Sequence, residues 1–263
     1  MSILDSASDV LRLMASKQSE LTMTDLVGAL DMPKSSASRV LKHMTSVGLL
    51  VRNPTSLAYR PSLLLLELSH LVRSTTPLIE MCQQALDVLG REFGQTGYVS
   101  LLDGNDVVVL HVRPGTQALR AMTNPGYRSP AWATSTGRSL LARESNADVR
   151  QRFSNGFHID APIGGPQTVD QLCDALDLVR AQRYAIAENE AFAGICSVGC
   201  AVGDPVSAET LSFCLSFPSG IYSAEQLVHL ADSVRSRAAL IARAVGDVFW
   251  ASAPVTPSSS HSF

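Results

Sequence analysis

The residues with the clearest chemical potential are the serines and basic side chains between Lys34 and Ser46. At helical spacing they share one predicted face, which contains Ser35, Ser38, Arg39, Lys42 and Ser46. Hydroxyl, ammonium and guanidinium groups are the donors that proteins direct at phosphate oxygens and at the edges of bases. This face therefore predicts recognition of a nucleic acid.

The other side of the same segment carries the apolar residues that would hold the helix in a domain. They recur at steps of three and four, and they are Ala37, Val40, Leu41, Met44 and Val47. Pro33 suits the first position of this helix, and Gly48 suits its end. The upstream stretch Thr22–Asp25 resembles a capping box that opens a shorter helix. A helix–turn–helix is therefore expected.

A short basic hairpin is predicted directly after these helices. Leu49–Arg52 and Leu57–Arg60 flank an Asn-Pro turn, and Lys34 to Arg60 contains no Asp or Glu. This is the layout of a winged DNA-binding domain. A merely solvated basic face is the alternative, and it is less favoured because the charge, the helix and the hairpin coincide. The predicted DNA-binding residues are Lys34, Ser35, Ser36, Ser38, Arg39, Lys42, Arg52 and Arg60.

The chain beyond residue 60 changes in character. Residues 61–76 predict a helix with leucines on several sides, which would be buried between domains or against a second subunit. Residues 77–250 mix helical and strand patterns without a regular βαβ period, so an antiparallel sheet flanked by helices is expected, an α+β fold. Residues 251–263 are rich in Ser and Pro, which predicts disorder.

Particular elements can be placed within residues 77–250. Strands are predicted over 98–102, 107–112, 196–202 and 211–217. Helices are predicted over 78–93, 134–143, 168–183 and 223–249. Capping boxes are expected at the starts of the last two helices, at Thr168–Gln171 and at Ser223–Gln226.

Composition and motifs restrict the function classes. The 263 residues have a net charge of −3, which excludes a uniformly basic nucleic-acid coat. No signal peptide and no apolar run of about 18 residues is present, which predicts a cytoplasmic protein without membrane contact. The five cysteines lack CxxC pairing and predict buried reduced thiols. No zinc spacing, P-loop or dinucleotide fingerprint occurs, so neither a metal nor a cofactor is expected.

These segments, in this order, resemble the IclR-type family of bacterial transcription regulators over residues 3–248. The likeness rests on LTMTDLVGALDMPKSSASRVLKHMTSVGLL, VRNPTSLAYR, LLLLELSHL, PAWATSTGRSLLA, RYAIAENEAFAGICSVGCAV and SFCLSFPSGIYSAEQL. It implies a winged helix–turn–helix in residues 1–60, a linker helix in 61–76 and a GAF-like effector-sensing domain in 77–250. It also implies double-stranded operator DNA and a small organic or aromatic acid as partners, and assembly as a homodimer or a dimer of dimers.

The resemblance carries individual pocket positions onto this chain. The family's cysteine falls on Ser197, and a register slipped by one residue would put Cys196 there instead. The family's acid falls on Ala187, although Glu190 matches. These changes argue against a glyoxylate- or pyruvate-type effector and leave room for a larger one. Ser135 and Thr136 would supply backbone donors to a ligand carboxylate. The predicted effector-binding residues are Leu119, Ala121, Ser135, Thr136, Ala187, Ser197, Cys214 and Ser216.

Several functions remain open at this level. Repression of a catabolic operon is favoured by resemblance alone, and activation is the alternative. A DNA-binding oligomer without an effector is a third possibility. Catalysis is disfavoured because the stretch Gly194–Gly199 has Ile195 where a nucleophile elbow needs glycine. A Ser–His–Asp set dispersed along the chain is not excluded by one sequence.

Overall fold

The computed structural model describes residues 2–17, 19–74, 77–116, 123–157 and 164–251. By contacts the chain divides into two compact units, Met1–Thr75 and Thr76–Phe263. No helix among the described residues is long and apolar enough to cross a membrane.

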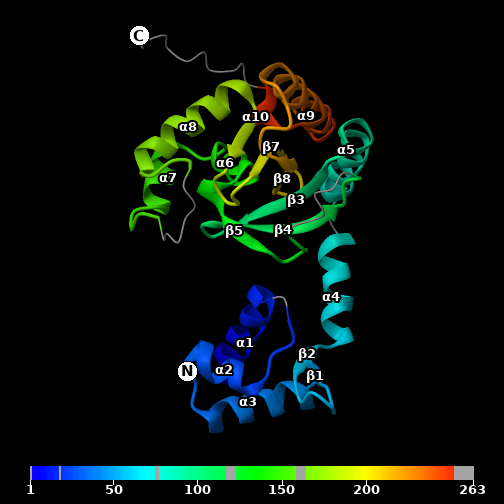
Figure 1. Ribbon diagram of the computed structural model, residues 1–263, viewed down its shortest axis with the longest axis vertical. Coiled ribbons are helices and arrows are strands. Elements are labelled where there is room, and N and C mark those ends of the chain that lie inside the picture. The colour runs from blue at the N-terminus through cyan, green and yellow to red at the C-terminus, as the bar shows by residue number, and fades with distance from the viewer. Residues whose placement is uncertain (1, 18, 75–76, 117–122, 158–163, 252–263) are drawn as a thin grey trace. The chain divides into compact units, whose positions relative to one another are not determined.

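The first unit is a three-helix domain with a small hairpin and one further helix. Its elements are α1 (Ile3–Lys17), α2 (Met23–Leu30), α3 (Lys34–Ser46), β1 (Leu50–Arg52), β2 (Tyr59–Pro61) and α4 (Leu63–Ser74) (Figure 1). The core is formed by the inward side chains of α1, α2 and α3, including Val10, Leu26 and Leu41. Leu21 and Tyr59 exchange backbone hydrogen bonds of 3.0 and 2.8 Å, which tie the hairpin to the start of α2.

The local signals around α3 are largely confirmed. Thr22 Oγ1 accepts from the Asp25 N–H at 3.3 Å, and Asp25 Oδ2 accepts from the Thr22 N–H at 2.8 Å, so the capping box is present. Two expectations need correction. Pro33 precedes the helix, and its carbonyl accepts the Ala37 N–H at 3.0 Å. Val47 follows the helix, which ends at Ser46, and its side chain is 50% exposed instead of buried.

Helix α4 carries exposed leucines. Leu63, Leu64, Leu66 and Leu68 have between 41% and 74% of their surface exposed in the single chain. The burial expected for this helix between domains or against a second subunit therefore stays a prediction.

The second unit is built on a six-stranded sheet. Its helices are α5 (Pro77–Phe93), η1 (Ala131–Ala133), α6 (Ser135–Leu141), α7 (Asn146–Arg152), α8 (Val169–Gln182), α9 (Ala224–Val245) and α10 (Val248–Ala251). Its strands are β3 (Thr96–Asp103), β4 (Asp106–Arg113), β5 (Arg128–Pro130), β6 (Ala185–Glu188), β7 (Ile195–Asp204) and β8 (Glu209–Pro218). The strand order is β5-β4-β3-β8-β7-β6, and all pairings are antiparallel, which confirms the expected α+β class.

The two faces of the sheet are covered by different helices (Figure 1). On β7 the even-numbered side chains, such as Val198 and Cys200, are buried in a core together with α5 and α9. The odd-numbered Ala201 belongs to a second cluster, which includes Trp132 and Leu141 of η1 and α6. Because side chains alternate along a strand, the odd-numbered residues of β7 face the helix α6.

The strands and helices predicted for this unit are confirmed, with differences at one capping box and at the end of the final helix. The capping box at Thr168 is half formed, because the Gln171 side chain accepts from the N–H of Gln167 instead. The final helix ends at Val245 and not near Phe249, because Gly246 adopts a left-handed φ of 75°. The short elements β5, β6 and α7 were not predicted from residue patterns. The tail predicted to be disordered lies outside the described residues, apart from Ala251.

The start of α9 offers a stability test. Ser223 Oγ accepts from the Gln226 N–H, and the Gln226 side chain accepts from the Ser223 N–H at 2.9 Å. Ser223→Ala should lower the free energy of unfolding by about 1 kcal/mol. Urea unfolding followed by tryptophan fluorescence measures it, since both tryptophans, Trp132 and Trp250, lie in this unit. Ser236→Ala, at an exposed position inside α9, is the control and should not destabilise.

Candidate functional sites

The predicted DNA-binding residues form an exposed basic surface on the first unit. The side chains of Lys34, Ser35, Ser38, Arg39 and Lys42 on α3 are exposed, and Ser36 is half-buried at the edge of this face. Arg52 and Arg60 are exposed on the two hairpin strands, with the Arg52 guanidinium 5.6 Å from the centre of the Tyr59 ring. The structure thus brings the α3 residues to one face. Their contact with DNA stays a prediction.

The first turn of α3 adds backbone donors to this surface. No side chain caps the helix, and the first helical hydrogen bond is made by the N–H of Ala37. The preceding N–H groups of the first turn have no acceptor within the helix. Such groups favour an anion such as a phosphate.

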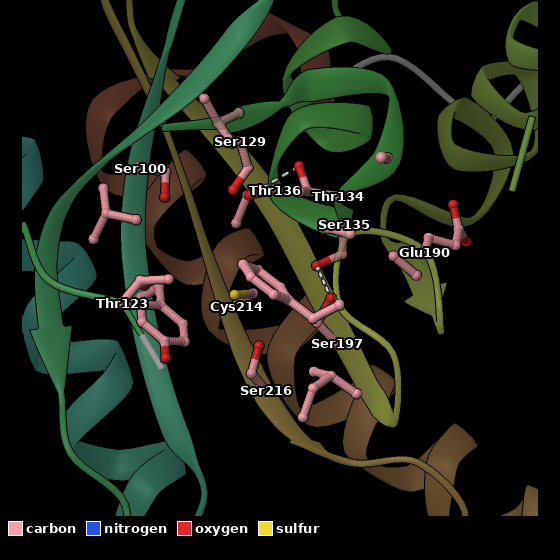
Figure 2. A pocket seen from close by; sticks show the side chains of 18 of the residues that line it. Ser100, Thr123, Ser129, Thr134, Ser135, Thr136, Glu190, Ser197, Cys214 and Ser216 are labelled. Carbon is pink, nitrogen blue, oxygen red and sulfur yellow. Dashed lines mark hydrogen bonds between the residues drawn. The ribbon is translucent and has the colours of Figure 1, made fainter. Parts of the chain in front are cut away.

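The second unit contains a pocket between the sheet and helix α6. Its space is about 640 Å³, counting the open solvent at its mouth. Ser135, Thr136, Ala187, Ser197, Cys214 and Ser216 of the predicted set line it. The other two predicted residues, Leu119 and Ala121, lie outside the described residues. Figure 2 shows the lining side chains, with ten of the polar ones labelled.

The alternation of side chains along β7 and β8 decides which of their residues reach the pocket. Ser197 lines it, and its pairing partners Ala187 and Ser216 on the neighbouring strands line it as well. Cys196 points the other way and is 2% exposed in the core beneath α5 and α9. The alternative register, with Cys196 in the pocket, therefore does not agree with the structure.

A pair of serines closes one side of the pocket. The Ser135 and Ser197 hydroxyl oxygens are 2.8 Å apart and hydrogen-bonded, and Figure 2 shows the two side chains pointing toward one another. Ser135 is placed by the start of α6, where Thr134 Oγ1 accepts from the Gly137 N–H at 3.0 Å. A side chain on Gly137 would meet the Ala131 carbonyl oxygen at 2.1 Å, so only glycine lets α6 lie this close to η1.

Glu190 lines another part of the pocket and belongs to an ion pair. Arg138 donates to both carboxylate oxygens of Glu190, at 2.6 and 2.8 Å, and it also donates to the Ile186 carbonyl oxygen. Arg138 is 4% exposed and Glu190 is 8% exposed. The bidentate geometry suits a buried guanidinium–carboxylate pair. The charge that Glu190 brings to the pocket is therefore already balanced.

The pocket thiol is poorly suited to nucleophilic chemistry. Burial raises the pKa of Cys214 to about 12, so this thiol is protonated at neutral pH. Burial raises the pKa of Cys196 to about 12 as well, with the nearby carboxylates of Glu188 and Glu190 adding to the effect. Because the thiolate is the reactive form of cysteine, neither residue is activated here.

Several lining residues were not anticipated. They include Tyr98, Ser100, Val107, Val109, Thr123, Tyr127, Ser129, Thr134, Ala191, Phe192 and Ile195. Strands were predicted over 98–102 and 107–112. Because side chains alternate along a strand, Tyr98 and Ser100 share one face of the first strand, and Val107 and Val109 share one face of the second. The face that meets the pocket is decided by the helices packed on the sheet.

A winged helix–turn–helix unit and an α+β unit with a small-molecule pocket, carried on one chain, define the class of ligand-sensing transcriptional regulators. Comparison with known proteins specifies the family. Residues 4–54 match the IclR helix-turn-helix domain, and residues 70–243 match the C-terminal domain of bacterial transcriptional regulators of the IclR type. The chain belongs to the IclR family.

Individual relatives agree with this assignment. The HTH-type transcriptional regulator KipR of Bacillus subtilis is 24% identical over 226 residues, which are 86% of this chain and 90% of that protein. A transcriptional regulator from Rhodococcus sp. RHA1 has a similar structure, with a TM-score of 0.73, 25% identity and coverage of 94% and 98% of the two chains. An IclR homologue of Microbacterium hydrocarbonoxydans, solved with 4-hydroxybenzoate, shares the fold with a TM-score of 0.77, 18% identity and coverage of 93% and 99%.

Proposed function

We propose that this protein represses a catabolic operon and releases its operator when a small organic or aromatic acid binds in the pocket of the second unit. The observation that carries the proposal is the joint presence of an acid-free basic face on α3 and the hairpin and a hydroxyl-lined pocket elsewhere in the same chain. The family supplies the role of transcriptional regulator. The repressing sign rests on resemblance.

The DNA partner is proposed to be a double-stranded operator with inverted half-sites. In a helix–turn–helix protein the second helix of the motif enters the major groove. Helix α3 is that helix, and its exposed Arg39 can pair bidentately with guanine. The hairpin arginines Arg52 and Arg60 would contact backbone phosphates or the minor groove. A homodimer, or a dimer of dimers, would space the half-sites about 34 Å apart per helical turn.

The effector is proposed to be an acid because the pocket offers hydrogen-bond donors that suit a carboxylate. The pocket thiol is not activated as a nucleophile, which favours binding over catalysis. The Ser135 and Thr136 N–H groups lie in the first turn of α6 and lack helical acceptors. The related protein solved with 4-hydroxybenzoate supports an aromatic acid as one possible class. Small lining residues such as Ala187, Ala191 and Ser197 leave room for a ring.

Control of DNA binding requires that the effector prefers one arrangement of the winged units over another. Helix α4, which follows the hairpin, is the proposed element that transmits this preference. The opposite sign, in which the effector promotes DNA binding or activates transcription, is the second candidate. The same experiment distinguishes the two.

The test combines ligand binding with operator binding. An acid that fits the pocket should raise the melting temperature of the full chain, because binding only the folded form stabilises it by about 2.7 kcal/mol at a hundredfold excess over Kd. The same acid should weaken a gel shift with DNA from the protein's own promoter region. A stronger shift would assign the opposite sign. A shift that no stabilising acid changes would contradict effector control and favour an effector-free oligomer.

A further inference from the structure

The charges of the pocket limit the acids that it can hold. Among the described lining residues Glu190 is the one Asp or Glu, and no lysine, arginine or histidine is among them. Arg138, which pairs with Glu190 and is not among these lining residues, directs its two terminal nitrogens to Glu190 and to the Ile186 carbonyl oxygen. This guanidinium is buried and already bonded, so it is not available to a ligand.

The pocket instead supplies neutral donors. A serine hydroxyl has one proton and two acceptor lone pairs. The Ser135–Ser197 pair has two protons and uses one of them in its own 2.8 Å hydrogen bond, so the other is not used in this contact. Thr134 Oγ1 accepts from the Thr136 hydroxyl at 3.4 Å and from the Gly137 N–H at 3.0 Å, so its proton is also unused in these contacts. These donors suit one carboxylate and an uncharged oxygen.

The remainder of the described lining is apolar or aromatic. Val107, Val109 and Ile195 contribute aliphatic surface. The rings of Tyr127 and Phe192 have centroids 6.0 Å apart and form a continuous part of this surface. A second carboxylate placed against these groups would lose its hydration without gaining a counter-charge, which is strongly unfavourable.

We infer that the pocket selects acids with a single carboxylate on an apolar body and discriminates against dicarboxylates. The inference rests on the proposed function, because it names the ligand class of the same pocket. In Figure 2 the Glu190 carboxylate points away from Ser135 and Ser197, so the hydroxyl pair is the position at which one anion meets donors and no fixed negative charge. The Ser135–Ser197 pair is thus assigned as the specificity-determining contact.

The test uses matched probes on the full chain. Calorimetric titration compares 4-hydroxybenzoate with terephthalate, and hexanoate with adipate, so that each pair differs in charge at similar size. In at least one pair the monocarboxylate should bind about tenfold or more tightly than its dicarboxylate, because the second charge is unpaired. The methyl ester of 4-hydroxybenzoate, which has no carboxylate, should bind more weakly than the acid. Equal or tighter binding of the dicarboxylates or the ester, or no binding by any probe, overturns the inference.

A charge added to the wall should change the preference. Ala191 lines the pocket and is half-buried, while Ala193 in the same loop is exposed and outside it. Ala191→Lys should shift the binding ratio toward dicarboxylates by about tenfold, because a cation would then face the second carboxylate. Ala193→Lys is the matched control and should leave the ratio unchanged. A folded Ala191→Lys variant with the ratio of the unmodified protein counts against the inference, and the matched probes on the unmodified chain decide it if that variant does not fold.

Failure of this inference and failure of the proposed function give different results. A dicarboxylate that binds tightly and releases the operator overturns the single-charge limit and leaves effector-controlled repression standing. A monocarboxylate that binds selectively without changing the operator gel shift supports the limit and contradicts the proposed function.

Discussion

Replacing Arg138 by methionine should lower the free energy of unfolding of the second unit by about 3–5 kcal/mol, the cost of leaving one member of a buried ion pair unpaired. Glu190 would be left without its partner at a site that is 8% exposed. It would lose both guanidinium hydrogen bonds, of 2.6 and 2.8 Å. Methionine retains the unbranched stem, so the loss reports on the ion pair more than on packing.

The measurement is urea unfolding followed by tryptophan fluorescence, which reports on the second unit because Trp132 and Trp250 both lie there. Arg150→Met is the control. Arg150 pairs with Asp170 at 3.0 Å on the surface, with both side chains more than half exposed, and its loss should cost less than 1 kcal/mol. Adding Glu190→Gln to Arg138→Met should restore part of the stability, because the uncompensated charge is then removed. Equal losses for Arg138→Met and Arg150→Met would show that the pair does not support the wall.

Replacing Arg39 by alanine should remove about 1–3 kcal/mol of discrimination between operator and random DNA. Arg39 lies on the exposed face of α3, and the core of the unit is formed by the other face of that helix. The substitution should therefore leave folding, self-association and effector binding intact. Its effect is expected on sequence selectivity, because a guanidinium can read guanine in the major groove.

Arg60 provides the contrast. It is exposed on β2 of the hairpin, and a phosphate contact there would contribute to affinity and not to sequence reading. Arg60→Ala should weaken binding to operator and random DNA alike and reduce the dependence of log K on log salt concentration by about one unit. Competition gel shifts at several salt concentrations measure both quantities. Unchanged discrimination by Arg39→Ala would refute its base-reading role.

Local signals in the sequence were sufficient for much of the fold. The spacing of Ala37, Val40, Leu41 and Met44 predicted the buried stripe of α3, and all four are buried. The capping boxes at Thr22 and Ser223 formed as predicted, because they depend on residues three positions apart. Elements with short or weak patterns, such as β5 and α7, were not found. They are only 3 and 7 residues long, so they contain too few positions to show a period.

Less of the effector pocket than of the fold could be predicted from residue patterns. The resemblance placed six residues that line it, but residue patterns alone did not identify Tyr98, Ser100 or Tyr127, which come from other elements. Neighbours in this wall are far apart in the chain, as the Ser135–Ser197 hydrogen bond and the Arg138–Glu190 pair both show. No periodicity contains such pairings, because they depend on how α6 packs against the sheet.

Residue patterns and the order of motifs predicted a DNA-binding part followed by an α+β part, the amphipathic helices, the basic face of α3 and the family to which the chain is similar. These features follow from neighbours within a few positions and from the order of motifs. Only the folded chain shows that Ser197 and not Cys196 faces the pocket, and that Glu190 lines it already paired with Arg138. Both depend on strand register and on helix packing, where a shift of one residue would exchange the two faces of β7.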